Sequence, residues 1–168
     1  RDDLVTGVQT CALPIYYLFP SQLENAIDIQ VEEAKKLGIR VVLTRGSMSL
    51  GEDDGGLPPQ SVVQTKEQIL SDSERLITTY HDSSQGSMTQ IALAPCSPFS
   101  VTTDLMIETA ELAEQHNVRL HTHLAETIDE ENFCLEKFGL RTVDYLESVG
   151  WLSNRTWLAH GIHFNKEE

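Results

Sequence analysis

The sequence predicts an α/β protein built around a parallel β-sheet. Short apolar runs of strand length alternate with longer segments of helical period, and four such runs occur, at 39–46, 90–96, 118–124 and 155–160. Strands separated by helices of this length are typical of parallel βαβ units. Distinctive polar residues also gather where these runs end, and the carboxyl edge of a parallel sheet is where α/β proteins bind ligands.

The first helix and strand are expected within residues 21–46. Ser21 is a candidate N-cap for the helix, and Gly38 is placed to end it. One face of this helix carries Leu23, Ile27, Val31 and Ala34. The β-branched run 39–46 follows and predicts a strand.

The rest of the chain continues the same alternation. Apolar side chains recur near helical spacing before each of the three remaining strands. We therefore expect, in order, helix 66–81, strand 90–96, helix 102–116, strand 118–124, a helical stretch that continues to Gly150, and strand 155–160.

One loop is long enough to contribute to function. It runs from Gly46 to Ser61, directly after the first predicted strand, and is rich in glycine, proline and acidic residues. A loop that follows a strand lies at the carboxyl edge of the sheet, so we expect it near the binding site.

The composition is that of a strongly acidic chain. Its 168 residues carry a formal net charge of −14, which argues against nucleic acid or an anionic membrane as partner, because either requires a basic face. No apolar run approaches the roughly 18 residues that a membrane span requires. The three cysteines, Cys11, Cys96 and Cys134, are odd in number and widely spaced, which indicates reduced thiols in a cytoplasmic protein.

The segment HTHLAET at 121–127 carries the strongest chemical signal. Strand geometry puts His121 and His123 on one face, and a turn can return the carboxylate of Glu126 to the same edge. Imidazole suits Zn²⁺ or a similar divalent ion, and a nearby carboxylate can take a proton from water that the metal activates. The alternative is a pair of buried, hydrogen-bonded histidines with Glu126 capping the next helix, and spacing alone leaves both open.

Two further segments place reactive side chains at strand ends. In WLAHGIH, Leu158 and His160 share one strand face, so we expect His160 to point inward, where it can polarise a substrate carbonyl or contact the activated water. In APCSPF, Cys96 is either a small buried apolar residue or a pocket wall. A zinc-binding Pro-Cys-x-x-Cys motif is excluded because Phe99 stands at the second cysteine position.

Together these residues resemble a known family. The segments RLHTHLAET, TVDYLESVGWL and TWLAHGIH are similar to the amidohydrolase superfamily, in the branch that contains guanine deaminase. The segments TRGSMSLGEDDGGLPPQSVVQ and IALAPCSPFSVT are similar to 8-oxoguanine deaminases and hydroxyatrazine-type ethylaminohydrolases. The resemblance implies a (β/α)₈ TIM barrel, of which the chain covers about strands three to six, with one divalent metal ion, usually zinc, at the barrel mouth.

The resemblance also implies roles for individual residues. His123 corresponds to the metal ligand that ends strand five, and Glu126 corresponds to the proton shuttle. His160 corresponds to the strand-six histidine that polarises the water or the substrate carbonyl. Cys96 and Arg45 fall where relatives place substrate-facing residues around the mouth.

The resemblance leaves His121 outside the metal shell. Two strand–helix units precede His121, and the glutamate three residues after His123 belongs to strand five. The family's other ligands, a His-x-His pair after strand one and an aspartate after strand eight, are absent from the chain. We therefore expect the chain alone to be inactive and assign the function to the full-length protein.

The implied function is hydrolytic deamination of an amine-bearing purine-type ring by metal-activated water, as in 8-oxoguanine deaminases. An s-triazine ethylaminohydrolase of the hydroxyatrazine type is the alternative within this class, and a non-catalytic fragment or binding module is the alternative from another class. The expected partner is a small-molecule purine or triazine, with no nucleic acid and no membrane. The full-length protein is expected to be able to form a homo-oligomer.

The opening segment, residues 1–15, is expected not to belong to the native protein. It contains VTGVQTCALPI, which resembles the in-frame translation of a common sequencing adapter. The similarity to amidohydrolases begins after it, at about Tyr16. We therefore expect residues 16–168 to be a fragment of the amidohydrolase barrel and set residues 1–15 aside when reasoning about the fold.

Overall fold

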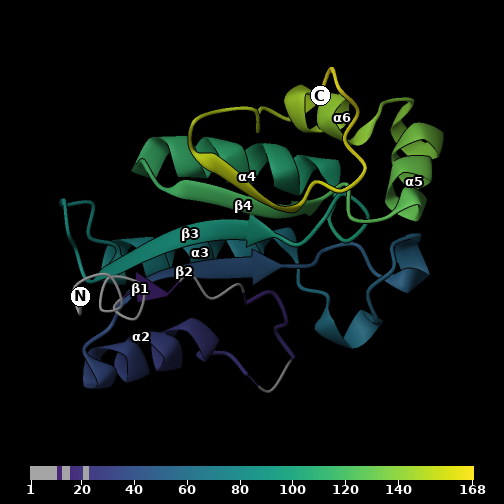
Figure 1. Cartoon of the computed structure of the whole chain (residues 1–168). Coiled ribbons are helices and arrows are strands. Elements are labelled where there is room, and N and C mark those ends of the chain that lie inside the picture. The colour runs from purple at the N-terminus through teal and green to yellow at the C-terminus, as the bar shows by residue number, and fades with distance from the viewer. Residues whose placement is uncertain (1–10, 13–15, 21–22) are drawn as a thin grey trace.

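The fold is a parallel sheet whose strands follow one another in chain order. The computed structural model describes residues 11–12, 16–20 and 23–168. Every neighbouring pair of strands is parallel. The strands are β1 (Cys11–Ala12), β2 (Arg40–Ser47), β3 (Thr89–Pro95), β4 (Arg119–Leu124) and β5 (Thr156–His160) (Figure 1).

The four expected strands are confirmed as β2 to β5, and β1 is an addition. β1 lies inside the opening segment 1–15, where no strand was expected, and it pairs with the start of β2. Residues 1–10 and 13–15 lie outside the described part of the chain. The adapter origin of residues 1–15 therefore stays a prediction.

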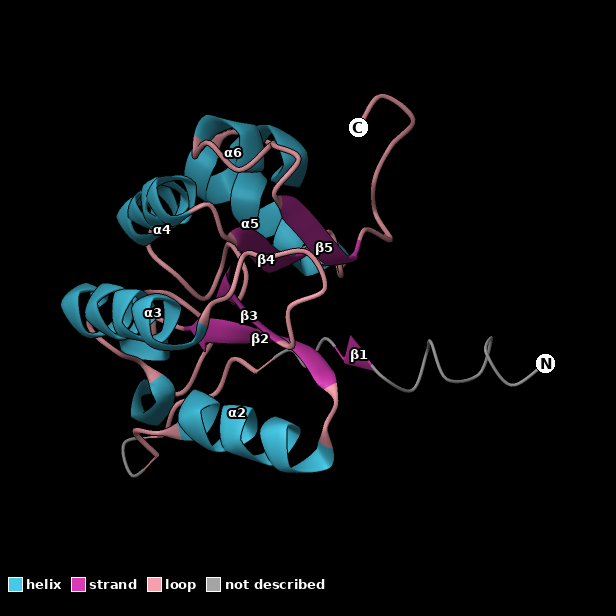
Figure 2. Ribbon diagram, turned by 90° about the vertical axis from the view of Figure 1, so that its left-hand side faces the viewer, coloured by secondary structure: helices cyan, strands magenta, loops and turns pink. Residues whose placement is uncertain are grey.

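The helices gather on one side of the sheet. Figure 2 shows α2, α3, α4 and α6 on the same side, while the opposite face of the sheet carries no helix from the described residues. A doubly wound sheet would reverse its strand order and carry helices on both faces, whereas sequential parallel strands with one helical layer form the wall of a (β/α)₈ barrel. The predicted partial barrel is confirmed. The helices are α2 (Ala26–Leu37), α3 (Lys66–Tyr80), α4 (Thr103–His116), α5 (Ile128–Phe138) and α6 (Thr142–Ser148).

Two expectations about helix ends need correction. Helix α2 begins at Ala26, with Asn25 at its N-cap, and Ser21 lies outside the described residues. The single helical stretch to Gly150 is in fact two helices, because Gly139 adopts a left-handed conformation with φ of 70° and ends α5. The predicted stop of α2 at Gly38 is confirmed. Across the described residues, every helix is too short or too polar to cross a bilayer.

The hydrophobic core lies between the sheet and its helical layer. Leu43 of β2, Leu93 of β3 and Leu120 of β4 face the helices and are at most 2% exposed. Trp151 follows α6, is fully buried, and donates its indole N–H to the carbonyl oxygen of Met106 at 2.9 Å. Burial of each such side chain contributes about 1.5–3 kcal/mol. This apolar layer holds the helices to one face of the sheet.

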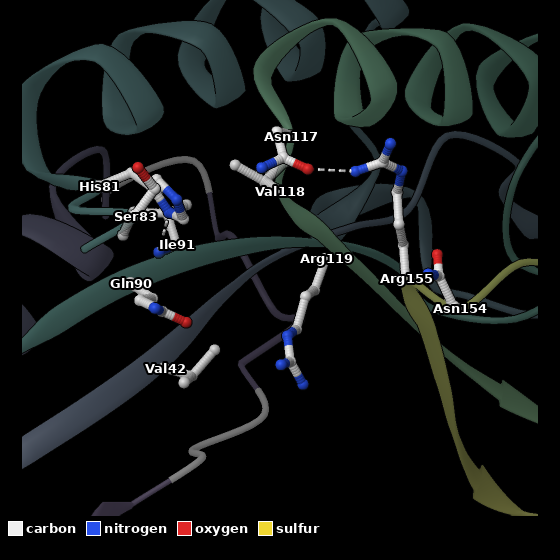
Figure 3. Close-up of a pocket in the computed structure, with 10 residues that line it drawn as sticks. All are labelled: Val42, His81, Ser83, Gln90, Ile91, Asn117, Val118, Arg119, Asn154 and Arg155. Carbon is white, nitrogen blue, oxygen red and sulfur yellow. Dashed lines mark hydrogen bonds between the residues drawn. The ribbon is translucent and has the colours of Figure 1, made fainter. Parts of the chain in front are cut away.

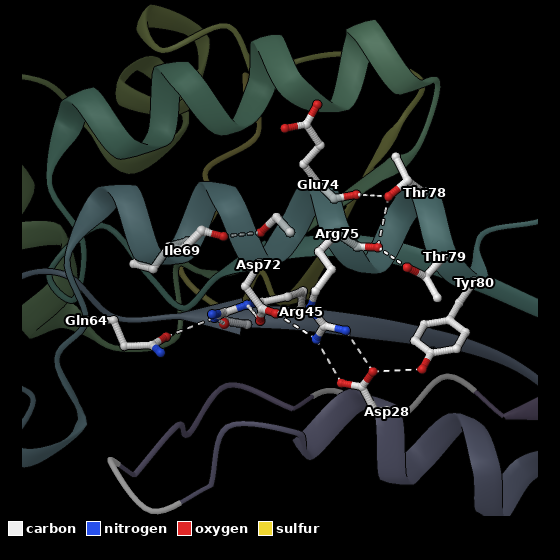
Figure 4. Close-up of polar contacts among 12 residues, drawn as sticks. Asp28, Arg45, Gln64, Ile69, Asp72, Glu74, Arg75, Thr78, Thr79 and Tyr80 are labelled. Carbon is white, nitrogen blue, oxygen red and sulfur yellow. Dashed lines mark hydrogen bonds and ion pairs between the residues drawn. The ribbon is translucent and has the colours of Figure 1, made fainter.

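A polar network crosses the same helical layer beside β2. The guanidinium of Arg45 is buried, donates to the Asp72 carboxylate at 2.9 Å, and lies 4.0 Å from the ring centroid of Phe19. Arg75 donates to Asp72 and, through two nitrogens, to Asp28 of α2 at 2.8 Å each (Figure 4). The network therefore ties α2 and α3 to the carboxyl end of β2.

The long loop after β2 is attached to the loop after β3. The backbone N–H groups of Ser49 and Leu50 donate to the carbonyl oxygen of Ser100, and that of Leu57 donates to Phe99. Two short 3₁₀ turns, Glu52–Asp54 and Gln60–Val62, give this loop its shape. The predicted placement of the loop at the carboxyl edge of the sheet is confirmed.

Replacing Asp72 by alanine would leave the Arg45 guanidinium buried beside no carboxylate of the described residues. We expect Asp72→Ala to lower the free energy of unfolding by about 3 kcal/mol, because removing one partner of a buried ion pair leaves an uncompensated charge. The matched control is Glu33→Ala, which removes the exposed pair with Lys36 and should leave stability unchanged. Equal midpoints for the two variants in a denaturant titration would contradict the role given to Asp72.

Candidate active site

A polar cavity opens at the carboxyl ends of β3, β4 and β5. Its volume is about 320 Å³. Four of the five predicted site residues meet there, although they come from different strands and the loops that follow them. The lining residues are Tyr17, Cys96, Ser97, Phe99, His123, Glu126 and His160.

His123 is held in one orientation by a single carbonyl group. Both its backbone N–H and its ring Nδ1 donate to the carbonyl oxygen of Cys96, at 2.9 and 2.8 Å. A proton on Nδ1 leaves the lone pair of Nε2 free, which is the tautomer that a metal-binding imidazole requires. The chemistry of this ring therefore fits a metal ligand.

His160 reaches the cavity by a turn of the backbone. By register it lies opposite Leu124, and Leu158 of the same strand packs against the core on the helical side. The expected inward direction therefore doesn't follow from strand alternation. Instead His160 has φ of 74°, and its ring lies 5.5 Å from that of His123.

Glu126 and His160 form a contact pair across the cavity. The Nε2 atom of His160 lies 3.4 Å from Oε2 of Glu126. Both side chains remain partly exposed, at 33% and 44%, so a substrate can reach them. The carboxylate, its histidine neighbour and the free Nε2 of His123 together offer a proton acceptor, a second hydrogen-bonding ring and a ligand for a cation.

Cys96 forms a neutral wall of the cavity. Its Sγ atom lies 3.9 Å from Nδ1 of His123. Burial raises the pKa of the Cys96 thiol to about 11, so the group is protonated at neutral pH. Of the two possibilities left open by the sequence, the structure favours the pocket wall.

Two aromatic residues of the cavity could not be identified from the sequence. The ring of Tyr17 packs edge-on against His123, with ring centroids 5.3 Å apart. Phe99 packs edge-on against Phe133 of α5 at 6.1 Å. In the sequence, Phe99 is informative only because it excludes a zinc-deaminase motif. Nothing local to Tyr17 signals a site, because its place depends on a contact with the distant end of β2.

That contact depends on Gly46. The backbone N–H of Gly46 donates to the carbonyl oxygen of Tyr16 at 2.9 Å, and the N–H of Tyr16 donates to the hydroxyl of Thr44 at 2.8 Å. The segment that carries Tyr17 therefore passes over β2 at Gly46, where the absence of a side chain leaves room for it.

His121 is buried in the barrel wall, outside the cavity lining. Its Nδ1 donates to the carbonyl oxygen of Trp157 at 3.1 Å, and its Nε2 has no hydrogen-bond partner within the described part of the chain. Burial and the neighbouring His123 lower the pKa of His121 to about 4, so its ring is neutral at pH 7. His121 is not among the residues that line the cavity.

The structure corrects the expected position of Arg45. We expected Arg45 over the mouth, but it shares the helical face of β2 with Leu43, two residues earlier. Besides Asp72 it donates to the side chain of Gln64 at 3.0 Å and to the carbonyl of Gly46. Strand alternation directs it away from the cavity, so its contacts are structural.

The cavity contains one imidazole nitrogen suited to a metal ion. No group of three or more histidine, cysteine, aspartate or glutamate side chains within the described residues is arranged to hold an ion. His123 supplies one suitable nitrogen, and further ligands would have to come from elsewhere in a longer protein.

A second cavity lies at the opposite, amino ends of the strands. It measures about 350 Å³ and is lined by residues such as His81, Arg119 and Arg155 (Figure 3). Arg155 donates to the side chain of Asn117, and in Figure 3 the side chains of Arg119 and Arg155 point in different directions. None of the predicted catalytic residues lines this cavity, and we do not assign the chemistry to it.

Sequence comparison relates the chain to proteins of known activity. A sequence profile of the amidohydrolase family matches residues 9–168, beginning inside the opening segment. The chain is 66% identical over 166 residues to 8-oxoguanine deaminase of Pseudomonas aeruginosa, covering 99% of this chain and 37% of that protein. It is 34% identical over 138 residues to hydroxydechloroatrazine ethylaminohydrolase of Pseudomonas sp. (strain ADP), covering 82% of this chain and 28% of that protein.

A solved structure has the same arrangement of strands and helices. A variant of atrazine chlorohydrolase from Arthrobacter aurescens TC1, complexed with zinc and atraton, superimposes with a TM-score of 0.90 at 31% identity. The match covers 98% of this chain and 37% of that one. The chain therefore spans about a third of the length of the relatives that it matches.

Substitution at Gly46 tests how Tyr17 is held at the cavity. A Cβ atom at residue 46 would lie 2.1 Å from the carbonyl oxygen of Tyr16 and 2.3 Å from Cα of Tyr17, too close for either to stay in place. We expect Gly46→Ala to lower the free energy of unfolding by about 1–3 kcal/mol and to move Tyr17 away from His123. Calorimetry and a crystal structure of the variant measure both effects. An unmoved Tyr17 would contradict this account.

Proposed function

The chain belongs to the amidohydrolase family, and we therefore propose that the full-length protein removes an amino group by hydrolysis from a purine-type ring. The observation that carries the proposal is the cavity in which His123, Glu126 and His160 meet. The free Nε2 of His123 and the paired side chains beside it supply the functions that hydrolysis of a C–N bond requires.

His123 would hold a divalent cation, most suitably Zn²⁺, through Nε2. The hydrogen bond from Nδ1 to the Cys96 carbonyl places the proton of the neutral tautomer on Nδ1 and fixes the direction of the ring. A bound ion of this kind lowers the pKa of water to about 7 and so makes a nucleophile available at neutral pH. The zinc in the atrazine chlorohydrolase structure supports the choice of metal.

Glu126 would move the proton during the reaction. The oxygen of water adds to the ring carbon that bears the amine, the C–N bond breaks, and Glu126 carries a proton from the water to the leaving nitrogen, which departs as ammonia. His160, 3.4 Å from the carboxylate, would orient it and hydrogen-bond to the substrate ring. Cys96, protonated at neutral pH, would line the substrate side.

The proposed substrate is a purine of the 8-oxoguanine type. The identity to the Pseudomonas aeruginosa 8-oxoguanine deaminase is about twice that to the triazine ethylaminohydrolase, which favours a purine over a triazine. The aromatic side chains of Tyr17 and Phe99 suit a flat ring of either kind.

An assay of the full-length protein tests the substrate. We expect the protein to release ammonia from 8-oxoguanine, as measured by a coupled ammonia assay. We expect it to release little or no ethylamine from hydroxylated s-triazines. Ethylamine release without any ammonia from the purine would reverse the choice between these two substrates. Loss of activity on treatment with a chelator, and its return with Zn²⁺, would test the metal.

Glu126→Gln in the full-length protein tests the proton shuttle. We expect kcat to fall about 1,000-fold, because a general acid–base group contributes roughly 10² to 10⁴ in rate and the amide cannot take up a proton. Metal content, measured by plasma mass spectrometry, should match that of the wild type, since Glu126 is not the proposed ligand. Turnover near the wild-type rate would refute the shuttle role.

A further inference from the structure

Helix α5 carries a buried carboxylate that the proposed reaction does not use. Glu130 is 1% exposed and does not line the cavity. Its two oxygens accept hydrogen bonds from consecutive backbone N–H groups, Oε1 from Ala125 at 3.0 Å and Oε2 from Glu126 at 2.9 Å. One of these donors is therefore the backbone of the proposed shuttle residue itself.

The turn that Glu130 holds is strained. Ala125 has φ of 52°, a left-handed conformation that costs a residue with a Cβ about 1–2 kcal/mol. In this conformation two successive N–H groups point to the same side and form a concave site for an anion. The Glu130 carboxylate occupies that site, and hydrogen bonds to a charged acceptor are stronger than those to a neutral one.

The opposite side of the same turn is bonded to the segment after His160. The carbonyl oxygen of Ala125 accepts N–H groups of Ile162 at 2.9 Å and His163 at 3.1 Å, and that of Leu124 accepts Gly161 at 2.9 Å. The backbones that carry Glu126 and His160 therefore share one rigid junction. Glu130 closes this junction from the helical side.

Glu130 is itself held by the start of α5. Its backbone N–H donates to the hydroxyl of Thr127, the N-cap residue, at 3.2 Å. The segment from Glu126 to Glu130 is thus a closed loop of side-chain and backbone bonds, and the carboxylate has little freedom to follow a displaced turn.

We propose that Glu130 is a positioning residue that fixes the backbone of Glu126 and so sets its carboxylate against His160. Its catalytic consequence rests on the proposed function, whereas the anchoring of the turn stands on the hydrogen bonds alone. Without the carboxylate, the strained turn at Ala125 relaxes and the Glu126 carboxylate is no longer held next to His160. The helix and the core beneath it remain.

The next residue provides a matched control. Glu131 is also buried, at 4% exposure, and lies on the same turn of α5. Its carboxylate pairs with Arg141 at 2.6 Å and accepts the hydroxyl of Thr142 at 3.3 Å, both at the start of α6. Loss of this carboxylate weakens the packing of α5 on α6 without touching the turn at Glu126.

The experiment compares Glu130→Gln with Glu131→Gln in the full-length, metal-loaded protein. We expect Glu130→Gln to lower kcat about 30-fold with KM changed less than about threefold, because small displacements of a reacting group cost up to about 100-fold in rate. Metal content should be unchanged. Glu131→Gln should lower Tm at least as much as Glu130→Gln but keep kcat within about threefold of the wild type.

A readout that needs no substrate separates this proposal from the proposed function. Amide hydrogen exchange of the segment 122–128, followed by mass spectrometry, should quicken in Glu130→Gln and stay as in the wild type in Glu131→Gln. A wild type that does not deaminate purines would overturn the proposed function and with it the catalytic role of Glu130. Unchanged exchange in Glu130→Gln would overturn the anchoring itself.

The kinetic comparison can also refute the proposal directly. Equal losses of kcat in the two variants, or wild-type turnover in Glu130→Gln, would contradict a positioning role. If Glu130→Gln does not fold, the same measurements are made on the double variant A125G/E130Q, because glycine adopts the left-handed conformation at residue 125 without strain. We expect that variant to fold and to keep the low kcat, because glycine adopts positive and negative φ about equally and so does not fix the turn without the Glu130 carboxylate. Wild-type turnover in it would overturn the proposal.

Discussion

The site depends on the hydrogen bonds that the Cys96 carbonyl oxygen accepts from His123. The ladder between β3 and β4 pairs Ala92 with Arg119 and Leu93 with Leu120. Beyond that point, the Cys96 oxygen accepts the backbone and ring N–H groups of His123 and keeps the strand ends together. The same bond sets the ring tautomer, so the geometry that closes the sheet also leaves Nε2 free for a ligand.

Two residues with positive φ bring the remaining polar groups to this point. Ala125 and His160 leave the strand conformation directly after β4 and at the end of β5. Each conformation is strained for a residue with a Cβ and persists because surrounding bonds determine it. The carbonyl oxygens of Leu124 and Ala125 accept N–H groups from the segment after His160, and Glu130 binds the turn from the other side. Strain and polar contacts therefore concentrate at the carboxyl edge, beside the cavity.

The two faces of the sheet carry different kinds of residues. The helical face carries the apolar core and the ion pairs around Arg45 and Asp72, which join α2 and α3 to β2. The other face and the carboxyl edge carry histidines and the cavity. The chain spans about a third of the length of its relatives. Under the proposed function, a longer protein would supply the remaining metal ligands, and this segment would supply Glu126, His160 and the ligand His123.

Much of this arrangement is readable from the sequence, because periodicity and helix stops are local properties. The period of the apolar runs determines the parallel α/β class, and the spacing of His123 and Glu126 at a strand end indicates that both lie at its carboxyl edge. The turn at Ala125, which brings Glu126 into the cavity, is a tertiary feature. The predicted direction of Arg45 is wrong. Arg45 lies two residues after the buried Leu43, so both side chains point to the helical face of the sheet. Tyr17 reaches the cavity through a backbone contact with Gly46, which no local pattern announces. The sequence by itself thus determined which strands end in reactive side chains. Only the tertiary structure decided which of those side chains share a cavity, because that depends on backbone turns and on contacts between segments far apart in the chain.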